Sequence, residues 1–468
     1  MRAAGGDMAD FSALAGVLLA NVTYELMLFA AVGLAIGGID DLAVDLIWLA
    51  RAGWRRLTVY RRHARMTARD LPPPDAPGRL AIFIGAWREA EVIGPMLHAA
   101  LDRYDHRDYR LYVGVYPNDP ETQAAVRAVA VRDGRVTMVS GIAPGPTTKA
   151  ECLNRLWQRL LLDERIEGRP FKAVVLHDAE DVVHPDELRI FDRLIERFDL
   201  VQLPVLPLIE TGWRRFVSGH YADEFAESHT KQMVVREALG AGVPSAGVGC
   251  AISRVAMERM ADGNGGRPFD EGSLTEDYEM GLRLARFGGR GVFVSMPAAP
   301  GAAPVAVRAY FPATFDTAVR QKTRWLTGIA LAGWDRLGWA GGPAETWMRL
   351  RDRRSILAAV VMAGGYGASL LLVLCVMLGV PPDHGPAFEG LLWFNLALLF
   401  WRAGMRMAMV ARLYGLAEGA RSLLRIVPAN IIAMAAARRA VVAYLTAGDG
   451  PPRWDKTRHH FPRDLPCG

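Results

Sequence analysis

The chain has 468 residues, of which 51% are hydrophobic, and a formal net charge of +5. This length accommodates a catalytic domain together with a membrane region, and the excess of apolar residues is concentrated toward the two ends. No basic stripe with interleaved aromatic residues is present, which argues against a nucleic-acid-binding protein. The four cysteines are far apart and indicate neither a zinc ribbon nor a disulfide framework.

The first apolar segment, residues 11–36, is long enough to cross a bilayer as a helix, although Asn21 and Glu25 interrupt it. A cleaved signal peptide is the alternative, but the positively charged n-region of such a peptide is nearly absent. The arginine-rich run over residues 51–65 predicts that the following segment lies in the cytosol. We therefore expect a membrane helix followed by a basic juxtamembrane segment.

After a proline-rich linker at 71–78, short apolar runs alternate with helical patterns. The runs that we interpret as buried strands are 80–86, 111–116, 136–140, 173–177 and 200–203. This alternation predicts an α/β domain whose sheet is mostly parallel with helices on both faces. Ligands in such sheets bind beyond the carboxyl ends of the strands, so the residues that follow each run are the candidate site residues.

Two further apolar segments, 356–378 and 391–410, predict two more membrane helices, since arginines flank both of them. The loop between them contains no lysine or arginine and should face the periplasm. The stretch 426–445 is also apolar, but a proline and two arginines interrupt it, which favours an interfacial helix over a fourth span. The expected divisions of the chain are 1–70, 71–345, 346–445 and a cytosolic tail at 446–468.

An acidic cluster follows the fourth predicted strand: Asp178, Glu180 and Asp181. Carboxylates this close together repel one another unless a cation or a hydrogen-bond donor holds them, and a divalent ion bridging a diphosphate would do so. The alternative is a solvated acidic turn that caps the helix expected near Asp186, where negative charge is favourable.

A second acidic pair, Glu276 and Asp277, precedes a helical pattern. One of these acids could accept the proton of an attacking hydroxyl group. A capping box between Ser273 and Glu276 is an alternative explanation for Glu276. Asp277 is less easily explained by capping.

Gln321, Arg324 and Trp325 are spaced three and four residues apart and therefore share one face of a predicted helix. Such a face can hold a diphosphate and stack on a sugar ring. An interfacial Arg/Trp anchor beside the membrane is the alternative interpretation.

Other candidates are weaker. His459 and His460 form a pair in a short tail with no second cluster of metal-ligating residues, so we expect docking or surface roles and not metal binding. Glu224, Glu227 and His229 lie on an expected helix at 213–237, which either borders an acceptor channel or is a solvated face.

Together these motifs resemble the family-2 glycosyltransferases of GT-A fold, which include the cellulose and hyaluronan synthases. The residues that carry the resemblance are 85–89 (Gly-Ala-Trp-Arg-Glu), Asp119, 178–181, 275–277 and 321–325. The chain is more similar to the bacteriophage adsorption protein B family of inner-membrane glycosyltransferases, in residues 177–185 and in the tail 454–462. This resemblance covers nearly the whole chain.

The resemblance implies a role for each site residue. Contacts to the donor nucleotide are implied for Glu89, Asp119, Lys149 and Asp178. Binding of Mg²⁺ or Mn²⁺ is implied for Asp178 and Glu180, with Asp181 as an alternative because the usual motif is Asp-x-Asp. Asp277, beside Glu276, would be the general base. The acceptor and the leaving diphosphate would be framed by Gln321, Arg324 and Trp325, and residues 249–253 would form the acceptor-side strand.

The implied function is inverting transfer from a nucleotide sugar, with a UDP-hexose or UDP-N-acetylhexosamine as donor. The product would be a cell-surface glycan or exopolysaccharide, built on a glycan or lipid-linked acceptor at the bacterial inner membrane and passed to a periplasmic or outer-membrane export partner. The alternatives are a non-processive transferase that makes a lipid-linked sugar, and a catalytically silent docking or signalling component. Family members can carry a cyclic di-GMP-binding domain after the tail, and we do not expect such a domain within residues 1–468.

Overall fold

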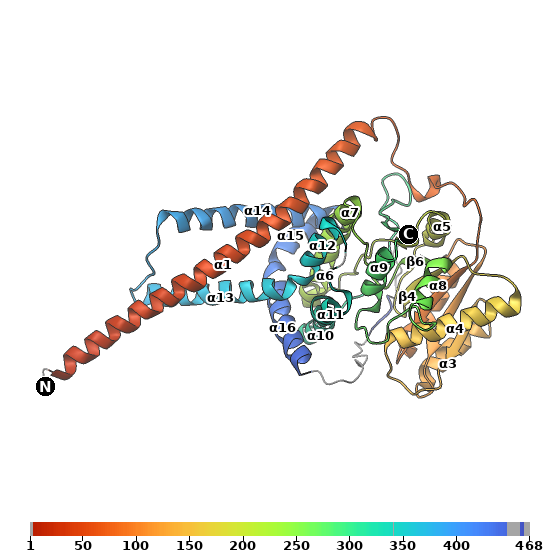
Figure 1. The fold of residues 1–468 in the computed structure, drawn as a ribbon, viewed down its shortest axis with the longest axis horizontal. Helices are drawn as coiled ribbons and strands as arrows, with labels where there is room; N and C mark the ends of the chain where they lie inside the picture. The colour runs from red at the N-terminus through yellow and green to blue at the C-terminus, as the bar shows by residue number, and fades with distance from the viewer. Residues whose placement is uncertain (1–2, 340, 447–458, 463–468) are drawn as a thin grey trace.

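The computed structural model describes residues 3–339, 341–446 and 459–462. Long helices extend from one side of an α/β domain, so that the molecule is elongated (Figure 1). The strands of this domain are β1 (Leu80–Gly85), β2 (Tyr109–Val115), β3 (Val136–Ser140), β4 (Ala173–Asp178), β5 (Leu200–Gln202), β6 (Cys250–Ser253) and β7 (Gly291–Phe293). All five predicted strands are confirmed.

The strands form one mixed sheet in the order β3-β2-β1-β4-β6-β5-β7. Parallel pairing joins β1 to both β2 and β4, and it also joins β2 to β3 and β5 to β7. Only β6 runs antiparallel to its neighbours within the described sheet. The register places Gly85 of β1 beside Asp178 of β4, so the two central strands end together.

Helices cover both faces of the sheet, as predicted. The helices of the α/β domain are α2 (Ala90–Arg103), α3 (Pro120–Ala130), α4 (Lys149–Glu167), α5 (Glu187–Leu194), α6 (Arg215–Glu227), α7 (Met233–Ala238), α8 (Arg254–Asp262), α9 (Glu276–Arg286), α10 (Phe315–Leu326), α11 (Ala332–Leu337) and α12 (Pro343–Arg353), with short helical turns η1 (Ala68–Asp70), η2 (Gly212–Arg214), η3 (Ser228–Gln232) and η4 (Thr327–Leu331). On β1, Ile82 and Ile84 pack with α2, α3 and α5, whereas Ala81 and Phe83 pack with α4, α8 and α9. Successive residues of a strand point to opposite faces, so one apolar strand supplies both halves of the core.

The helices outside the α/β domain are α1 (Ala3–Thr58), α13 (Ser355–Met377), α14 (Pro386–Tyr414), α15 (Leu416–Leu424) and α16 (Ile426–Leu445). The helix expected at 11–36 is therefore part of a single longer helix. Asp40 and Asp41 lie within it without breaking it, because Arg354 forms ion pairs with both carboxylates at 2.5 Å. A charge that is paired in this way costs much less to bury.

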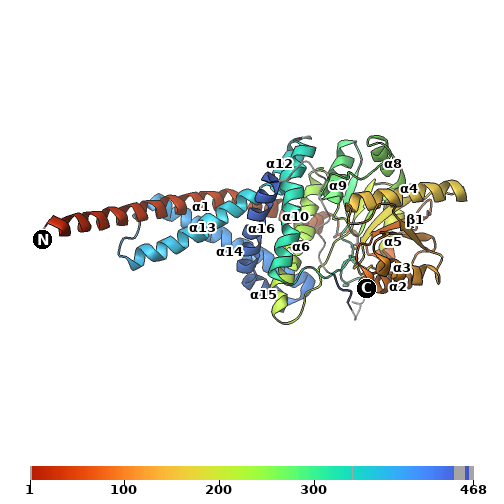
Figure 2. The same ribbon diagram turned by 90° about the horizontal axis from the view of Figure 1, so that it is seen from below.

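Among the described residues, three helices are long and apolar enough to cross a membrane: Ala13–Thr58, Ser355–Met377 and Ile426–Leu445. The span predicted at 391–410 lies in α14, which does not meet this criterion but runs beside α1 (Figures 1 and 2). Conversely, α16 meets the criterion, yet it packs against α13 and lies crosswise to it in both views. The membrane placement of α14 and the interfacial placement of α16 stay predictions.

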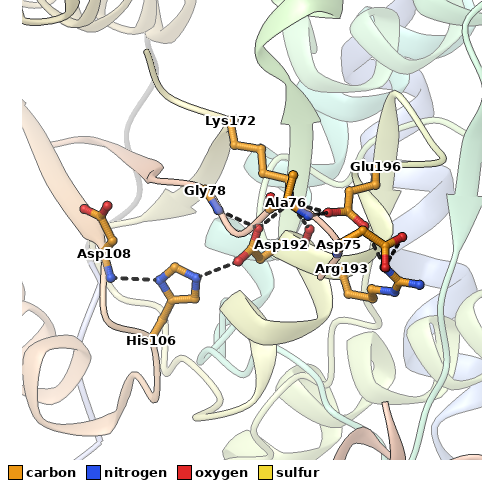
Figure 3. Close-up of polar contacts among 9 residues, drawn as sticks. All are labelled: Asp75, Ala76, Gly78, His106, Asp108, Lys172, Asp192, Arg193 and Glu196. Carbon is orange, nitrogen blue, oxygen red and sulfur yellow. Dashed lines mark hydrogen bonds and ion pairs between the residues drawn. The ribbon is translucent and has the colours of Figure 1, made fainter. Parts of the chain in front are cut away.

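Hydrogen bonds and ion pairs hold the linker between α1 and the sheet at the amino-terminal ends of the strands (Figure 3). Lys172 Nζ, directly before β4, lies 2.6 Å from Asp192 Oδ1 and 3.0 Å from Glu196 Oε1. Asp192 also accepts hydrogen bonds from the amide of Gly78, at 3.2 Å, and from His106, at 3.1 Å. This network lies at the edge of the sheet opposite to the strand end that carries Asp178.

Candidate active site

A cavity of about 130 Å³ lies beyond the carboxyl end of β4. It is lined by nine of the predicted site residues: Lys149, Asp178, Glu180, Asp181, Glu276, Asp277, Gln321, Arg324 and Trp325. Glu89 and Asp119 are not among its lining residues. The cavity therefore lies where ligands are expected to bind, beyond the strand ends.

Lys149 and Asp178 form an ion pair at the floor of the cavity. Lys149 is the first residue of α4, where the hydroxyl of the preceding Thr148 caps the helix by accepting from the amide of Glu151. Its Nζ lies 2.5 Å from Asp178 Oδ1. Burial alone would raise the pKa of Asp178, but the ammonium group holds that pKa below its usual value. Asp178 is therefore ionised, and Lys149 places a fixed positive charge beside it.

Glu89, Glu180 and His459 meet at the side of the cavity. His459 Nδ1 lies 3.0 Å from Glu89 Oε1 and 3.3 Å from Glu180 Oε2. One potential ligand atom from each residue lies within 4.8 Å of the others. Burial raises the pKa of Glu180 to about 8, against the opposing effect of His459. Two carboxylates and one imidazole form a donor set that fits a divalent cation.

His459 is the residue that sequence reasoning assigned differently. We expected docking or a surface position for it, whereas the structure brings it between Glu89 and Glu180. Burial alone would lower the pKa of His459, but the two carboxylates have the larger combined effect and raise it to about 9. The available signal was its place in the tail 454–462, whose residues 454–458 lie outside the described part of the chain.

Asp181 is held by the residues beneath the cavity. Its Oδ2 accepts hydrogen bonds from His177 Nδ1, at 2.8 Å, and from the amide of Asp178, at 2.9 Å. His177 is fully buried, and its Nε2 lies 2.5 Å from Glu187 Oε1. Burial opposes protonation of His177, yet the two carboxylates raise its pKa to about 10. One oxygen of Asp181 thus orders the 178–181 turn. The role of Asp181 as a metal ligand stays a prediction.

Asp119 organises the loop that carries Glu89. It caps α3, and its Oδ2 accepts a hydrogen bond of 2.5 Å from the amide of Arg88. Arg88 has a φ of +54°, which is uncommon for a residue other than glycine and is stabilised here by that bond. Thr122 of the same helix accepts from the amide of Glu89 at 2.9 Å. The nucleoside contacts implied for Asp119 and Glu89 stay predictions.

Glu276 and Asp277 begin α9 and face the cavity. Burial raises the pKa of Glu276 to about 7, and the neighbouring Asp277 adds to the shift. Burial also raises the pKa of Asp277 above its usual range. A carboxylate with a raised pKa is a stronger base, as proton abstraction requires.

The capping-box interpretation of Glu276 is wrong. Thr275, not Ser273, is the N-cap of α9. The hydroxyl of Ser273 instead donates to Glu279 Oε1 at 2.7 Å, and Arg336 holds the same carboxylate. Glu276 is thus left facing the cavity.

The three residues of α10 share the face that lines the cavity, as their spacing predicted. Trp325 packs edge-on against Tyr221, with ring centroids 5.9 Å apart. Gln321 Oε1 is buried and has no hydrogen-bond partner among the described residues. Buried polar atoms are normally paired, so this oxygen is available to a ligand.

The helix expected at 213–237 is divided into α6, η3 and α7. Its acidic residues are paired: Glu224 lies 2.5 Å from Lys322 Nζ, and Glu227 forms an ion pair with Arg406 of α14. His229 is buried and accepts from the amide of Val205 at 2.9 Å. This helical run is therefore not a solvated face.

Residues 77–328, more than half of the chain, match the family model described as glycosyltransferase like family 2. The chain belongs to this family. The glycosyltransferase is 41% identical, over 92% of its length, to bacteriophage adsorption protein B of Escherichia coli (strain K12) and to bacteriophage N4 adsorption protein B of Escherichia coli O157:H7. It spans 61% of the length of these curated relatives.

A solved structure supports the fold of this glycosyltransferase. It is that of the mannosyltransferase PcManGT from Pyrobaculum calidifontis in complex with GDP-Man and Mn²⁺, which matches with a TM-score of 0.53 at 16% identity. The match covers 89% of this chain and 99% of PcManGT. The predicted GT-A domain with attached apolar helices is thus confirmed, and the chain is an enzyme of glycosyltransferase family 2.

Proposed function

We propose that this glycosyltransferase transfers a sugar, with inversion, from a UDP-activated hexose or N-acetylhexosamine to a hydroxyl group of a glycan or lipid-linked acceptor. The observation that carries the proposal is that Asp277, Lys149 and Arg324 line the same cavity. A general base and two cations that can hold a diphosphate are thereby within reach of one substrate.

In the proposed reaction, Asp277 accepts the proton of the acceptor hydroxyl as that oxygen forms a bond to the anomeric carbon. Lys149 and Arg324 stabilise the negative charge of the departing nucleoside diphosphate. Trp325 offers an aromatic face to the acceptor sugar, and Gln321 Oε1, which has no partner among the described residues, accepts a hydrogen bond from one of the sugar's hydroxyl groups.

Glu89, Glu180 and His459 would hold a divalent cation, because their ligand atoms lie within 4.8 Å of one another, and Asp178 stays a further candidate from the sequence motif. When bound, Mn²⁺ or Mg²⁺ would neutralise charge on the diphosphate. PcManGT is described with GDP-Man and Mn²⁺, which supports the choice of ion class.

We place the enzyme in the bacterial inner membrane with the α/β domain in the cytosol. Two features support this placement: the apolar helices α1 and α13, and the arginine-rich segment at 51–65 that follows the apolar part of α1. The transfer cavity is close to these helices along the chain, since α10 leads through η4, α11 and α12 into α13. A product formed there would enter or cross the membrane as a surface glycan and pass to an export partner in the periplasm or outer membrane.

The test is release of nucleoside diphosphate by the purified chain in lipid nanodiscs, offered a panel of UDP- and GDP-sugars with Mn²⁺, with Mg²⁺ or with EDTA. We expect metal-dependent release with one UDP-sugar. Product length, measured by mass spectrometry, separates chain extension from a single lipid-linked sugar. Release with GDP-sugars alone would contradict the proposed donor, and release that is unaffected by EDTA would contradict the metal.

A further inference from the structure

A second cavity, of about 630 Å³, lies between the end of α1 and the α/β domain. Its walls come from α1, η3, α7, the end of α14 and the segment 293–304. We call it the arginine groove, after the five arginines that line it: Arg51, Arg55, Arg56, Arg65 and Arg412. None of the transfer-site residues lines the arginine groove.

The charge in the arginine groove is unbalanced. Glu237 is the one carboxylate that lines it, against five guanidinium groups. None of these guanidinium groups forms an ion pair within the described part of the chain. Like charges gathered in this way repel one another unless an anion lies between them.

The groove also contains a buried polar group, on Arg51. Arg51 Nε is buried and has no hydrogen-bond partner among the described residues. Other groups are held in place: Arg65 donates to the carbonyl of Ser295 at 3.3 Å, and Arg55 lies over the ring of Tyr60 at 5.2 Å. A buried donor without a partner is costly, and a ligand in the groove could satisfy Arg51 Nε.

Apolar residues line the groove where it meets the long helices. Trp48 precedes Arg51 by three residues and so lies on the same face of α1, and its Nε1 donates to the carbonyl of Thr230 at 3.0 Å. Leu206 and Leu413 complete this apolar part. The groove is thus amphipathic, with guanidinium groups beside an apolar wall.

We propose that the arginine groove is a binding site for a phosphate-bearing ligand, separate from the transfer cavity. Planar guanidinium groups bind phosphate through paired hydrogen bonds. Basic clusters next to a membrane helix attract the headgroups of anionic lipids, so a phospholipid is one source of the phosphate and a soluble phosphate compound is the other. The groove and the transfer cavity are joined by one helical run, since Phe225 of α6 lines the cavity while Thr230 and Val234 line the groove.

The test compares two variants with the same loss of charge. The groove variant is Arg51→Gln with Arg56→Gln, and the control is Arg61→Gln with Arg62→Gln, because Arg61 and Arg62 are exposed and do not line the groove. In the lipid arm, native mass spectrometry measures retention of dioleoylphosphatidylglycerol against dioleoylphosphatidylcholine. We expect wild type and control to retain the anionic lipid, and the groove variant to bind it about tenfold more weakly or worse.

In the soluble arm, the same proteins in phosphatidylcholine nanodiscs are titrated with pyrophosphate, and the thermal unfolding midpoint is measured. The transfer cavity can also take a diphosphate, so only the part of the shift that the groove variant loses is counted. If only the groove variant loses retention of the anionic lipid, the ligand is a phospholipid. If only the groove variant loses the pyrophosphate-induced shift, the ligand is a soluble phosphate compound. Equal behaviour of the two variants in both arms would overturn the proposal. If the groove variant does not fold, Arg412→Gln on α14 replaces it and is compared with Arg61→Gln alone, and we expect weaker phosphate binding by Arg412→Gln only.

Discussion

The backbone of Gly247 lies directly against the carboxylate of Asp277. A Cβ added to Gly247 would be 2.1 Å from Asp277 Oδ2, which is far inside van der Waals contact. Gly247 also has a φ of +75°, a conformation that other residues rarely adopt. The segment before β6 therefore fixes where the proposed base stands, through a contact that only glycine permits.

We expect Gly247→Ala to lower kcat about 100-fold, because a displacement of the base by about 1 Å costs that much in a positioned reaction. Donor affinity should change little, since Lys149 and Arg324 are untouched. Steady-state kinetics with the active donor measures both quantities. Gly265→Ala is the matched control, because Gly265 has a φ of +59° with open space around its Cβ position. An equal loss of kcat in both variants would attribute the effect to backbone strain and not to Asp277.

His459→Ala should raise the Mn²⁺ concentration required for half-maximal activity about 10- to 100-fold, since it removes one of three donor groups. The measurement is a Mn²⁺ titration at saturating nucleotide sugar. His460→Ala is the comparison: this neighbour stacks on Tyr310, with centroids 4.5 Å apart, and pairs with Glu210 at 2.8 Å. It should leave the Mn²⁺ requirement unchanged, and a requirement equally unchanged in His459→Ala would remove His459 from the metal site.

His177→Phe should destabilise the α/β domain by about 3–5 kcal/mol, because it leaves the buried carboxylates of Asp181 and Glu187 without their shared partner. Thermal unfolding in nanodiscs measures the effect. Adding Glu187→Gln should recover part of the loss, since it removes one of the two uncompensated charges. If His177→Phe unfolds at the wild-type temperature, the histidine does not carry the charge that we assign to it.

The same histidine predicts a pH dependence of stability. Its pKa is about 10 in the folded chain and 6.5 in an ordinary environment, so protonation favours the folded state. The contribution is fully present below about pH 6.5 and is lost as the pH rises through about 10. Wild type should therefore lose stability relative to His177→Phe across this interval. A constant difference between the two proteins from pH 6.5 to 10 would contradict the assignment.

Lys172→Met should lower the stability of the α/β domain by about 1–3 kcal/mol, the usual cost of leaving a buried polar group without a partner. Asp192 is 3% exposed, and Lys172 is the cation closest to it, with His106 and the Gly78 amide as its other partners (Figure 3). The matched control is Arg165→Met, a change of similar size on the exposed side of α4. Equal unfolding temperatures for the two variants would show that the linker network contributes nothing measurable.

The central sheet could be predicted from the sequence because its strands are buried on both faces and read as continuous apolar runs. The three-residue β7 was missed, since so short a segment gives no periodic signal. Sequence pattern also did not show that α1 is one helix of 56 residues. Its acidic residues Asp40 and Asp41 are neutralised by arginines more than 300 positions away, a pairing that only the tertiary structure creates.

Site residues close to strand ends or on one helix face were predictable, because local geometry brings them together. Asp178 follows the first rule, and Arg324 and Trp325 follow the second. His459 follows neither: it enters the site from a tail that lies beyond all the long helices, and its chemistry depends on Glu89, 370 positions earlier. Contacts at such a separation leave no local trace in the sequence.

The most direct test of Asp277 as the general base is the rate of nucleoside diphosphate release by Asp277→Asn in nanodiscs, with the donor and metal that support wild-type turnover. The change keeps the shape of the side chain and removes the base, so we predict a fall in kcat of about 10²- to 10⁴-fold with a folded protein and unchanged donor affinity. Asp262→Asn, at an exposed position, is the control and should retain full activity. Wild-type release by Asp277→Asn would contradict the assignment of Asp277 as the base and with it the proposed mechanism.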